Sequence, residues 1–233
     1  MQKRPSKLSE RIETLQTCRY FQGADEIILE QLARDTYLQR YQPGETIFWE
    51  GHECAGLHII RRGSIKLFKI SPQGRQMVMK IFADGDSFNE VPIFDGDTNP
   101  ISAAAITESD IWVVGCQAIR AAIDEHPEMA KAIILNLSVN LRMLVGLVEE
   151  LSFFQVTNRL ARLISQLPED QLEGRSEQRL TQDELAARLG TVREVVARSL
   201  KELERSGAIQ SERGRIQVMD DNLLKEWAQF PEN

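Results

Sequence analysis

The sequence predicts a fold of the α+β class: an N-terminal antiparallel β-roll of the jelly-roll type, a long dimerisation helix and a C-terminal winged helix-turn-helix. Three observations support this prediction. Short β-type runs alternate with glycine turns between about residues 37 and 115, an apolar heptad pattern follows, and the last third of the chain contains two capped helices and a hairpin. We therefore expect the β-roll and its N-terminal helices over residues 1–126, the dimerisation helix over 127–151 and the winged helix-turn-helix over 152–233.

The composition is typical of a soluble globular protein, with 42% hydrophobic and 27% charged residues in a chain of 233. Residues 1–7 are basic, but no apolar run follows them, which argues against a secretory signal. We expect no window to approach the roughly 18 apolar residues that a membrane span needs. The sequence thus predicts a cytoplasmic protein with no membrane partner.

Three cysteines, Cys18, Cys54 and Cys116, are widely spaced, and no CxxC pair occurs. Their number is too small for a four-thiolate zinc or iron–sulfur site within one chain, so no metal site is predicted. The expected role is that of small buried or half-exposed side chains. A redox-sensing thiol is the alternative.

Residues 8–35 are expected to form short helices, because Leu8, Ile12 and Leu15, and then Ile28 and Leu32, recur at helical spacing. Several short β-type runs come next, punctuated by Gly-containing turns. The runs are residues 46–49, 57–60, 65–68, 78–82 and 111–114. Many short strands at near-even spacing with glycine turns predict a jelly roll or a barrel.

A short helix over 117–125 should end at His126-Pro127. Beyond it, apolar residues follow a strict alternation of four-residue and three-residue steps, which is the a/d pattern of a coiled coil. These seam residues are Ala130, Ile134, Leu137, Leu141, Leu144, Val148 and Leu151. The pattern predicts a homodimer; the alternative, one amphipathic helix packed on its own domain, normally shows a wider apolar stripe. Residues 152–157 are interpreted as a hinge, 155–167 as a further helix and 168–179 as a loop.

Two helix starts are expected in the last third of the chain. Thr181 and Glu184 match a capping box that opens a helix over 182–189, and Gly190 follows where a left-handed residue would end it. Thr191 and Glu194 match a second capping box, opening a helix that ends at residues 206–207. Residues 209–212 and 215–218 then flank Arg213-Gly214 as the two strands of a wing. This arrangement is a helix-turn-helix with a hairpin wing.

The net charge of −7 is unusual for a DNA-binding protein, yet residues 188–215 carry seven Lys and Arg against four Glu, a local charge of +3. In the second helix, Glu194 and Arg198 share a face and Arg193 lies beside them. Arginine pairs with guanine and glutamate accepts from cytosine in the major groove of double-stranded DNA. The other expected DNA contacts are Thr181, Thr191, Lys201 and Arg213.

The chain resembles the CRP/FNR superfamily of bacterial regulators over about residues 15–220. Residues 151–161, residues 180–209 and the glycine turns of the roll, such as Pro43-Gly44 and Gly85-Asp86, carry the resemblance. It implies a transcription regulator whose roll senses an effector, a homodimer on a palindromic operator, RNA polymerase as a partner, and activation as the commoner output. Arg193, Glu194 and Arg198 match the Arg, Glu and Arg of cyclic-AMP-responsive members, which implies a TGTGA-like half-site rather than TTGAT.

The resemblance also locates an effector pocket and predicts that cyclic AMP does not fill it. Cyclic-AMP-binding members carry Gly-Glu near the end of the roll, where this chain has Asn89-Glu90. Their phosphate-binding Arg-Ser is matched by residues 99–102, Asn-Pro-Ile-Ser, so Ser102 remains and the arginine is lost. Leu144 and Val145 stand where hydroxyl residues contact the purine. The iron–sulfur branch needs four cysteines and is also excluded.

The effector and the function class leave alternatives open. A more apolar pocket is similar to that of haem-based gas or redox sensors, with His52, His58 and His126 as candidate ligands, although an unidentified small ligand or none is equally open. An enzyme of the cupin type would need two histidines one residue apart, and no HxH occurs, so no catalytic residues are predicted. A sensor or interaction module that no longer binds DNA is the remaining alternative.

Overall fold

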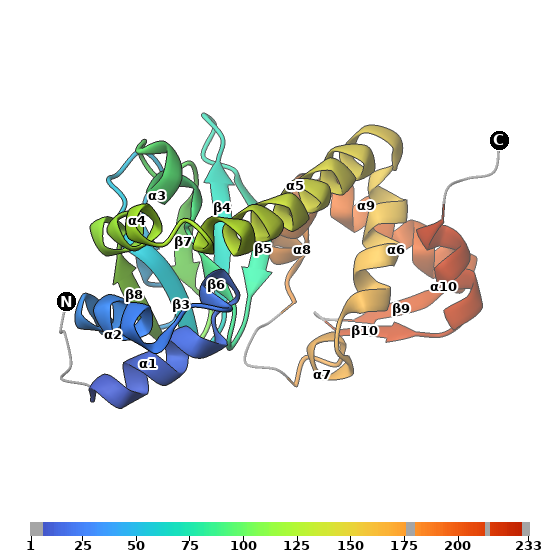
Figure 1. Ribbon diagram of the computed structural model, residues 1–233. Helices are drawn as coiled ribbons and strands as arrows, with labels where there is room; N and C mark the ends of the chain where they lie inside the picture. The colour runs from blue at the N-terminus through green and yellow to red at the C-terminus, as the bar shows by residue number, and fades with distance from the viewer. Residues whose placement is uncertain (1–6, 176–179, 213–214, 230–233) are drawn as a thin grey trace. The chain divides into compact units, whose positions relative to one another are not determined.

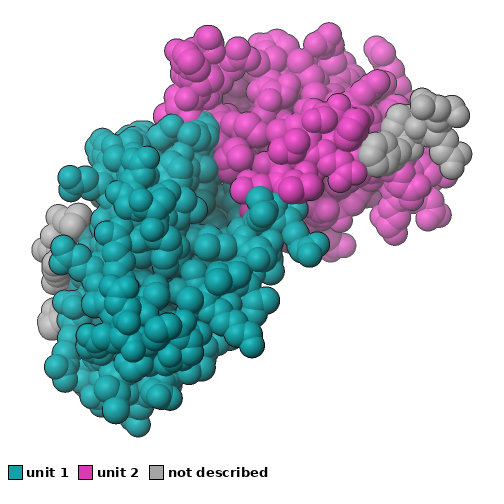
Figure 2. All heavy atoms as spheres, turned by 45° about the horizontal axis from the view of Figure 1, so that its top comes forward, with its two compact units in different colours: residues 1–69, 80–142 teal, residues 70–79, 143–233 magenta. Residues whose placement is uncertain are grey.

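The computed structural model describes residues 7–175, 180–212 and 215–229 (Figure 1). The chain divides into two compact units, residues 1–69 with 80–142, and residues 70–79 with 143–233 (Figure 2). The first contains most of the β-roll and its helices, and the second contains the helix-turn-helix. The α+β class predicted from the sequence is confirmed.

The roll consists of two four-stranded antiparallel sheets. The first has the order β1 (Thr36–Tyr41), β8 (Ser109–Gly115), β3 (Gly56–Arg62) and β6 (Ser87–Phe88). The second has the order β2 (Thr46–Phe48), β7 (Ser102–Ala105), β4 (Ile65–Ile70) and β5 (Gln76–Phe82). All five predicted runs form strands. The strands β1, β6 and β7 were not predicted, and β7 in particular consists of Ser and Ala, which have little intrinsic preference for strands.

The central strands β3 and β8 are buried on both faces. Leu57 and Ile59 of β3 belong to a core formed with the N-terminal helices, whereas Ile60 belongs to the core that contains residues of both sheets. Trp112 and Ile111 of β8 divide in the same way between the two cores. Two-sided burial explains why these strands have continuous apolar sequences rather than alternating ones.

Helices cover the outer face of the first sheet. They are α1 (Leu8–Thr17), a 3₁₀ turn (Arg19–Phe21), α2 (Glu26–Arg34), α3 (Val91–Asp95) and α4 (Cys116–Glu125). The predictions of short helices over 8–35 and 117–125 are confirmed, and α4 ends at His126, before Pro127, as expected. Buried residues of α1, α2 and α4, among them Leu15, Leu32 and Ile119, pack in the same core as Trp112.

The long helix α5 covers Met129–Phe153, so it begins and ends two residues later than the predicted range 127–151. By length and composition this helix is apolar enough to cross a membrane. The expectation that no segment of the chain reaches this threshold was therefore wrong. An apolar stripe that a second protein chain covers also raises the apolar content of a helix, and length and composition alone do not separate the two cases.

The joint after α5 is shorter than the predicted hinge over 152–157. Ser152 and Phe153 are helical, and the next helix, α6, covers Val156–Gln166, so only Phe154 and Gln155 lie between them. The guanidinium of Arg162 stacks on the Phe154 ring at 4.2 Å and lies 3.8 Å from the Glu150 carboxylate. These contacts bridge the end of α5 to α6 and explain why the helices run so close to the joint.

The second unit contains α6, α7 (Glu169–Leu172), α8 (Gln182–Leu189), α9 (Arg193–Ser206), β9 (Ile209–Glu212), β10 (Arg215–Val218) and α10 (Asp221–Ala228). A short helix, α7, interrupts the segment predicted as a loop over 168–179, and α10 was not predicted. The buried Arg159 of α6 donates to the Leu189 carbonyl at 2.7 Å. Because this carbonyl ends α8, the contact fixes the helix-turn-helix on α6.

His58 supplies a test of the roll's core. Burial lowers the pKa of this histidine from 6.5 to about 4, so it is neutral in the folded protein, whereas the unfolded chain binds a proton below pH 6.5. Its contribution to stability is complete above pH 6.5 and is lost progressively as the pH falls toward 4, reaching about 2 kcal/mol at pH 5. In His58→Asn the amide nitrogen can replace Nδ1, which lies 2.9 Å from the Gly56 carbonyl. Urea unfolding should show that the variant loses about 2 kcal/mol less stability than the native chain between pH 7 and pH 5. If the native chain and His58→Asn lost the same amount of stability between pH 7 and pH 5, the assigned pKa shift of His58 would be wrong.

Candidate functional site

The exposed face of α9 carries the side chains predicted to read DNA. The helix buries Val196, Leu200 and Leu203 in the core of the second unit, and this leaves the opposite face in solvent. The exposed charged residues on that face include the four predicted ones, Arg193, Glu194, Arg198 and Lys201, and also Arg205. The structure thus brings the predicted set together on one accessible surface, and none of the four is buried against another element.

The helix before it, α8, begins as the sequence predicts. The Thr181 hydroxyl accepts a hydrogen bond from the Glu184 amide at 3.1 Å. The Glu184 carboxylate accepts a hydrogen bond from Arg188 Nε, also at 3.1 Å, so it is engaged one turn ahead rather than by the amide of Thr181. Gly190 ends the helix in the left-handed conformation, with φ of 62°.

The second capping box was wrong. The residue that caps α9 is Val192, which has no side-chain hydrogen bond to offer, and the helix begins at Arg193. Thr191 instead belongs to the turn that ends α8, because its amide donates to the Ala186 carbonyl at 3.0 Å. Glu194 is consequently the second helical residue rather than the third, and it cannot complete a box with Thr191.

Arg193 extends toward the start of α8. Its Nε lies 3.4 Å from the Gln182 side-chain oxygen, and its guanidinium lies 3.7 Å from the Asp183 carboxylate. A hollow of about 820 Å³ lies between α8, α9 and the wing. Its lining includes Thr181, Arg193, Lys201 and Arg215. The hollow is also lined by Asp183 and Glu204, so three cations face two carboxylates and the lining carries a small excess of positive charge.

The wing is an antiparallel hairpin in which Glu212 of β9 pairs with Arg215 of β10. This confirms the predicted pair of strands. Arg213, predicted as a DNA contact at the tip, lies outside the described residues. Arg215, which the sequence analysis did not single out, is exposed at the base of the tip and belongs to the hollow described above.

The predicted seam of α5 forms an exposed apolar stripe. Leu141 and Val148 each expose 63% of their surface. Ile134, Leu144 and Leu151 are also exposed. Leu137 differs, because it is half-buried and packs against the core that α1, α2 and α4 form with the sheet. A single chain therefore leaves most of this stripe in water, where large apolar residues are unfavourable.

Two residues predicted to line an effector pocket, Asn89 and Glu90, belong to one polar cluster. Asn89 is buried with φ of 71°, a left-handed conformation that Asn tolerates and glycine favours, and its amide donates to Asn99 Oδ1 at 3.1 Å. The neighbouring Glu90 accepts a hydrogen bond of 2.6 Å from Asn140 of α5. Burial raises the pKa of the Tyr20 hydroxyl, and the Glu90 charge raises it further. This cluster joins the roll to α5.

The other proposed pocket residues make different contacts. Ser102 is buried and its hydroxyl accepts from the Glu50 amide at 3.0 Å. Leu144 and Val145 are exposed on α5, and Leu144 lies one turn beyond Asn140. The sequence analysis placed residues 99–102 at the pocket but did not predict that Asn99 bonds to Asn89, and it missed Asn140, the partner of Glu90. Polar residues separated by ten and fifty positions from their partners leave no local signal in a single sequence.

The three histidines do not fit an axial haem ligand. His58 is buried and stacks on the Phe88 ring at 5.0 Å, with Nδ1 against a carbonyl. His126 ends α4 and its Nδ1 lies 3.3 Å from Glu128. His52 lies in an exposed turn. The described residues contain no group of three His, Cys, Asp or Glu that could hold a metal ion.

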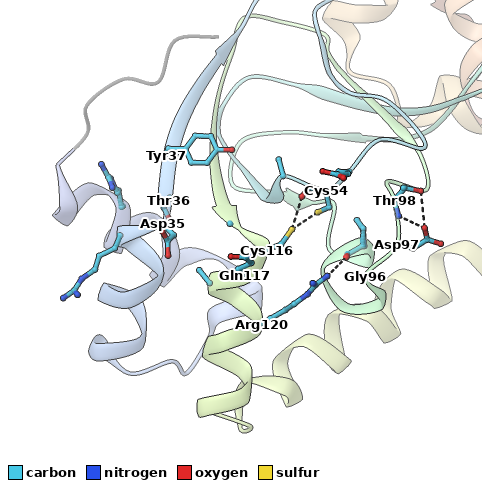
Figure 3. A pocket seen from close by; sticks show the side chains of 17 residues that line it. Asp35, Thr36, Tyr37, Cys54, Gly96, Asp97, Thr98, Cys116, Gln117 and Arg120 are labelled. Atoms are coloured by element: carbon cyan, nitrogen blue, oxygen red, sulfur yellow. Dashed lines mark hydrogen bonds between the residues drawn. The ribbon is translucent and has the colours of Figure 1, made fainter.

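A cavity of about 1130 Å³ opens on the roll, lined by residues from the start of β1, the end of β8, the start of α4, and the loops before β3 and after α3 (Figure 3). Cys54 and Cys116 both line it, and their Sγ atoms lie 3.0 Å apart. The sequence analysis treated these cysteines as separate, because they are 62 positions apart and only the pairing of β3 with β8 brings them together.

Comparison with known proteins agrees with both units. Residues 38–126 match the cyclic nucleotide-binding domain, and residues 158–227 match the Crp-like helix-turn-helix domain. The chain is 30% identical over 217 residues to the CRP-like cAMP-activated global transcriptional regulator of Mycobacterium tuberculosis, covering 91% of this chain and 97% of that protein. The chain belongs to the CRP/FNR family. It is accordingly a DNA-binding transcription regulator of CRP type, and the family consists of regulators rather than enzymes.

Two solved structures illustrate the shared fold. One, from Eubacterium rectale, is assigned to the CRP/FNR family of transcriptional regulators; its TM-score is 0.78 at 20% identity, covering 90% of this chain and 98% of that chain. The other is CLP of Xanthomonas campestris, described as a c-di-GMP-responsive global regulator. Its TM-score is 0.70 at 22% identity, and the match covers 84% of this chain and 100% of that chain.

The caps of α8 and α9 give opposite expectations for two similar residues. Thr181→Ala removes the hydroxyl that accepts from the Glu184 amide and should lower the free energy of unfolding of the second unit by about 1 kcal/mol. Thr191→Ala removes a hydroxyl that caps no helix and should change it by less than about 0.5 kcal/mol. Thermal or urea unfolding of the two variants, which serve as each other's control, measures the difference. If Thr191→Ala lowered the free energy of unfolding more than Thr181→Ala does, Thr191 would cap α9 after all.

Proposed function

We propose that the protein acts as a homodimer that binds a palindromic operator with TGTGA-like half-sites, under the control of an effector other than cyclic AMP sensed by the roll. The observation that carries this proposal is the exposed face of α9, on which Arg193, Glu194 and Arg198 stand together. Membership of a family of regulators supports cytoplasmic location and action with RNA polymerase as parts of the same proposal.

The chemistry of α9 suits direct reading of bases. Arg193 and Glu194 occupy the first turn of the helix, and Arg198 lies one turn beyond Glu194. In a major groove, the guanidinium groups would donate to guanine O6 and N7, and the carboxylate would accept from a cytosine amino group. A TGTGA-like element contains such G·C base pairs. Thr181, Thr191, Lys201 and Arg213 are proposed as the surrounding contacts.

The exposed stripe of α5 supports the homodimer. Its apolar residues recur at a/d positions over three heptads, which matches the surface that a second copy of the same helix would cover. A two-fold dimer would place two copies of α9 about one turn of DNA apart, or roughly 34 Å. The palindrome follows from that symmetry. Dimer arrangement is also the property that an effector would change, by shifting the population between two states.

The region around Asn89 supports an effector other than cyclic AMP. Neither Asn89 nor Asn99, which occupy the ends of the segment that binds phosphate in cyclic-AMP-responsive relatives, carries a positive charge. Both amides already bond to each other, and Asn99 also donates to the Glu53 carbonyl at 3.3 Å. A cyclic phosphate would therefore find no fixed cation from these residues, and one charge-assisted hydrogen bond alone contributes about 1.5–3 kcal/mol.

Measurements of operator binding test the proposed role of the exposed face of α9. Arg198→Ala should weaken binding to a palindromic TGTGA-containing duplex by about 1–3 kcal/mol, roughly 5-fold to 150-fold, and relax the preference at one base position. Fluorescence anisotropy against duplexes that carry each single-base change measures both effects. Lys225→Ala is the matched control, since Lys225 is an exposed cation on α10 paired with Asp221. An equal loss on every sequence would assign Arg198 to phosphate instead, and no preference for the palindrome in the native protein would refute the proposal.

Measurements of self-association test whether the apolar stripe of α5 is the dimer interface. Leu141→Glu would bury two carboxylates in a symmetric seam and should raise the dimer dissociation constant by at least about 100-fold. Arg142→Glu, the next residue and outside the a/d positions, is the control and should leave the constant within a few-fold. Sedimentation velocity over a concentration series measures both. If Leu141→Glu remained as dimeric as the control, the seam would not be the interface.

A further inference from the structure

Strand pairing brings two thiols together at one end of the roll. Cys54 lies two residues before Gly56, the first residue of β3, and Cys116 directly follows Gly115, the last residue of β8. Gly56 and Gly115 are partners in the antiparallel ladder. Residues just beyond that pair must therefore meet, and the Cys54 and Cys116 Sγ atoms lie 3.0 Å apart.

The glycine at the start of β3 makes this approach possible. A Cβ built on Gly56 would lie 2.0 Å from the Val114 carbonyl oxygen, and its φ of 153° is one that side chains rarely adopt. Only glycine lets the backbone pass this close to β8. The position of Cys54 beside Cys116 is thus set by the backbone of the ladder and not by a flexible loop.

The surroundings make the two thiols unequal. Cys116 opens α4, and Arg120 lies one turn further along the same face of that helix. The hydrogen bond with the Cys54 thiol and then the charge of Arg120 lower the pKa of Cys116 to about 7, in spite of partial burial. The same hydrogen bond and burial raise the pKa of Cys54. At neutral pH one sulfur is a thiolate for much of the time and the other remains a thiol.

Both sulfurs are accessible to a small molecule. Cys54 and Cys116 are half-buried and line the cavity of about 1130 Å³, in which Arg120 extends beneath them toward α3 (Figure 3). Cys18 provides a contrast within the same unit: it is buried, and burial raises the pKa of its thiol. A soluble oxidant therefore has a path to the pair that it lacks to Cys18.

We propose that Cys54 and Cys116 form a reversible dithiol site, at which Cys116 is oxidised by a hydroperoxide and Cys54 then closes an intramolecular disulfide. The Cys116 thiolate attacks the terminal oxygen of the hydroperoxide, the O–O bond breaks, and the alkoxide leaves and takes up a proton as an alcohol. Cys116 is then a sulfenic acid. Cys54 loses its proton and attacks Cys116 Sγ; the S–O bond breaks, and hydroxide leaves with that proton as water. Two thiols lose two electrons in total, and one hydroperoxide gains them.

The geometry needs little change to reach the product. The two sulfurs must approach from 3.0 Å to the length of a disulfide bond, a movement of about 1 Å. The pair also contacts the polar cluster around Asn89 and Glu90, which links the roll to α5. The Asn89 amide nitrogen lies 3.6 Å from Cys54 Sγ, and the adjacent Glu90 bonds to Asn140 of α5. If the proposed function holds, oxidation would act on the helix that carries the dimer stripe.

The test uses the full-length reduced protein and hydrogen peroxide. We expect intact mass to fall by about two mass units, non-reducing peptide mapping to find Cys54 linked to Cys116, and dithiothreitol to restore the original mass. Cys116→Ser should slow peroxide consumption by about tenfold or more. Cys54→Ser should instead accumulate a sulfenic acid at Cys116 that dimedone traps. Cys18→Ser is the matched control and should behave as the native chain. The rate for the native chain should reach half its maximum near pH 7, rather than near the value of about 8.5 for an ordinary thiol.

Two results would overturn the site: oxidation of the native chain without the Cys54–Cys116 link, which needs no variant to observe, or reaction of Cys116→Ser at the native rate. Operator affinity of the reduced and oxidised protein separates this proposal from the proposed function. If neither state prefers the palindrome but the disulfide forms, the DNA-binding assignment fails and the dithiol site stands. If the reduced protein prefers the palindrome but no disulfide forms, the dithiol proposal fails alone.

Discussion

The antiparallel pairing of β3 with β8 is the constraint on which the first unit depends. Both strands are buried on two faces, so each side chain must satisfy either the core under the helices or the core between the sheets. A shift of one residue would exchange Leu57 with His58 and place the histidine among the helices. The same ladder ends at Gly56 and Gly115, and it thereby determines where α4 begins and which residues face the cavity.

From this ladder, short polar contacts lead to the long helix. Arg120 of α4 donates to the Ile93 carbonyl at 2.6 Å and to the Pro92 carbonyl at 3.1 Å, so it holds α3 against α4. Glu90, directly before α3, accepts from Asn140 of α5. Each contact is short and involves a charged partner, which makes it stronger than an ordinary hydrogen bond. These contacts connect the roll to α5 through the few residues around α3.

Local patterns were sufficient for much of the fold. The helix-turn-helix was predictable because the cap at Thr181, the turns at Gly190 and Gly207, and the apolar spacing of α9 all act within a few residues. The same holds for the seam of α5. Strand β7 was missed because burial, not propensity, makes Ala103–Ala105 a strand. The Cys54–Cys116 pair and the Asn140–Glu90 contact were missed because only tertiary pairing creates them.

The wrong prediction at the start of α9 has a physical consequence for the reading surface. A threonine cap would have occupied an amide of the first turn, whereas no side chain among the described residues caps the helix that Val192 precedes. The first amides of α9 therefore remain for solvent or a ligand, beside Arg193 and at the positive end of the helix dipole. Phosphate oxygens suit such a position. A capped first turn would have stabilised the isolated domain slightly more, but it would have offered fewer donors to a DNA backbone.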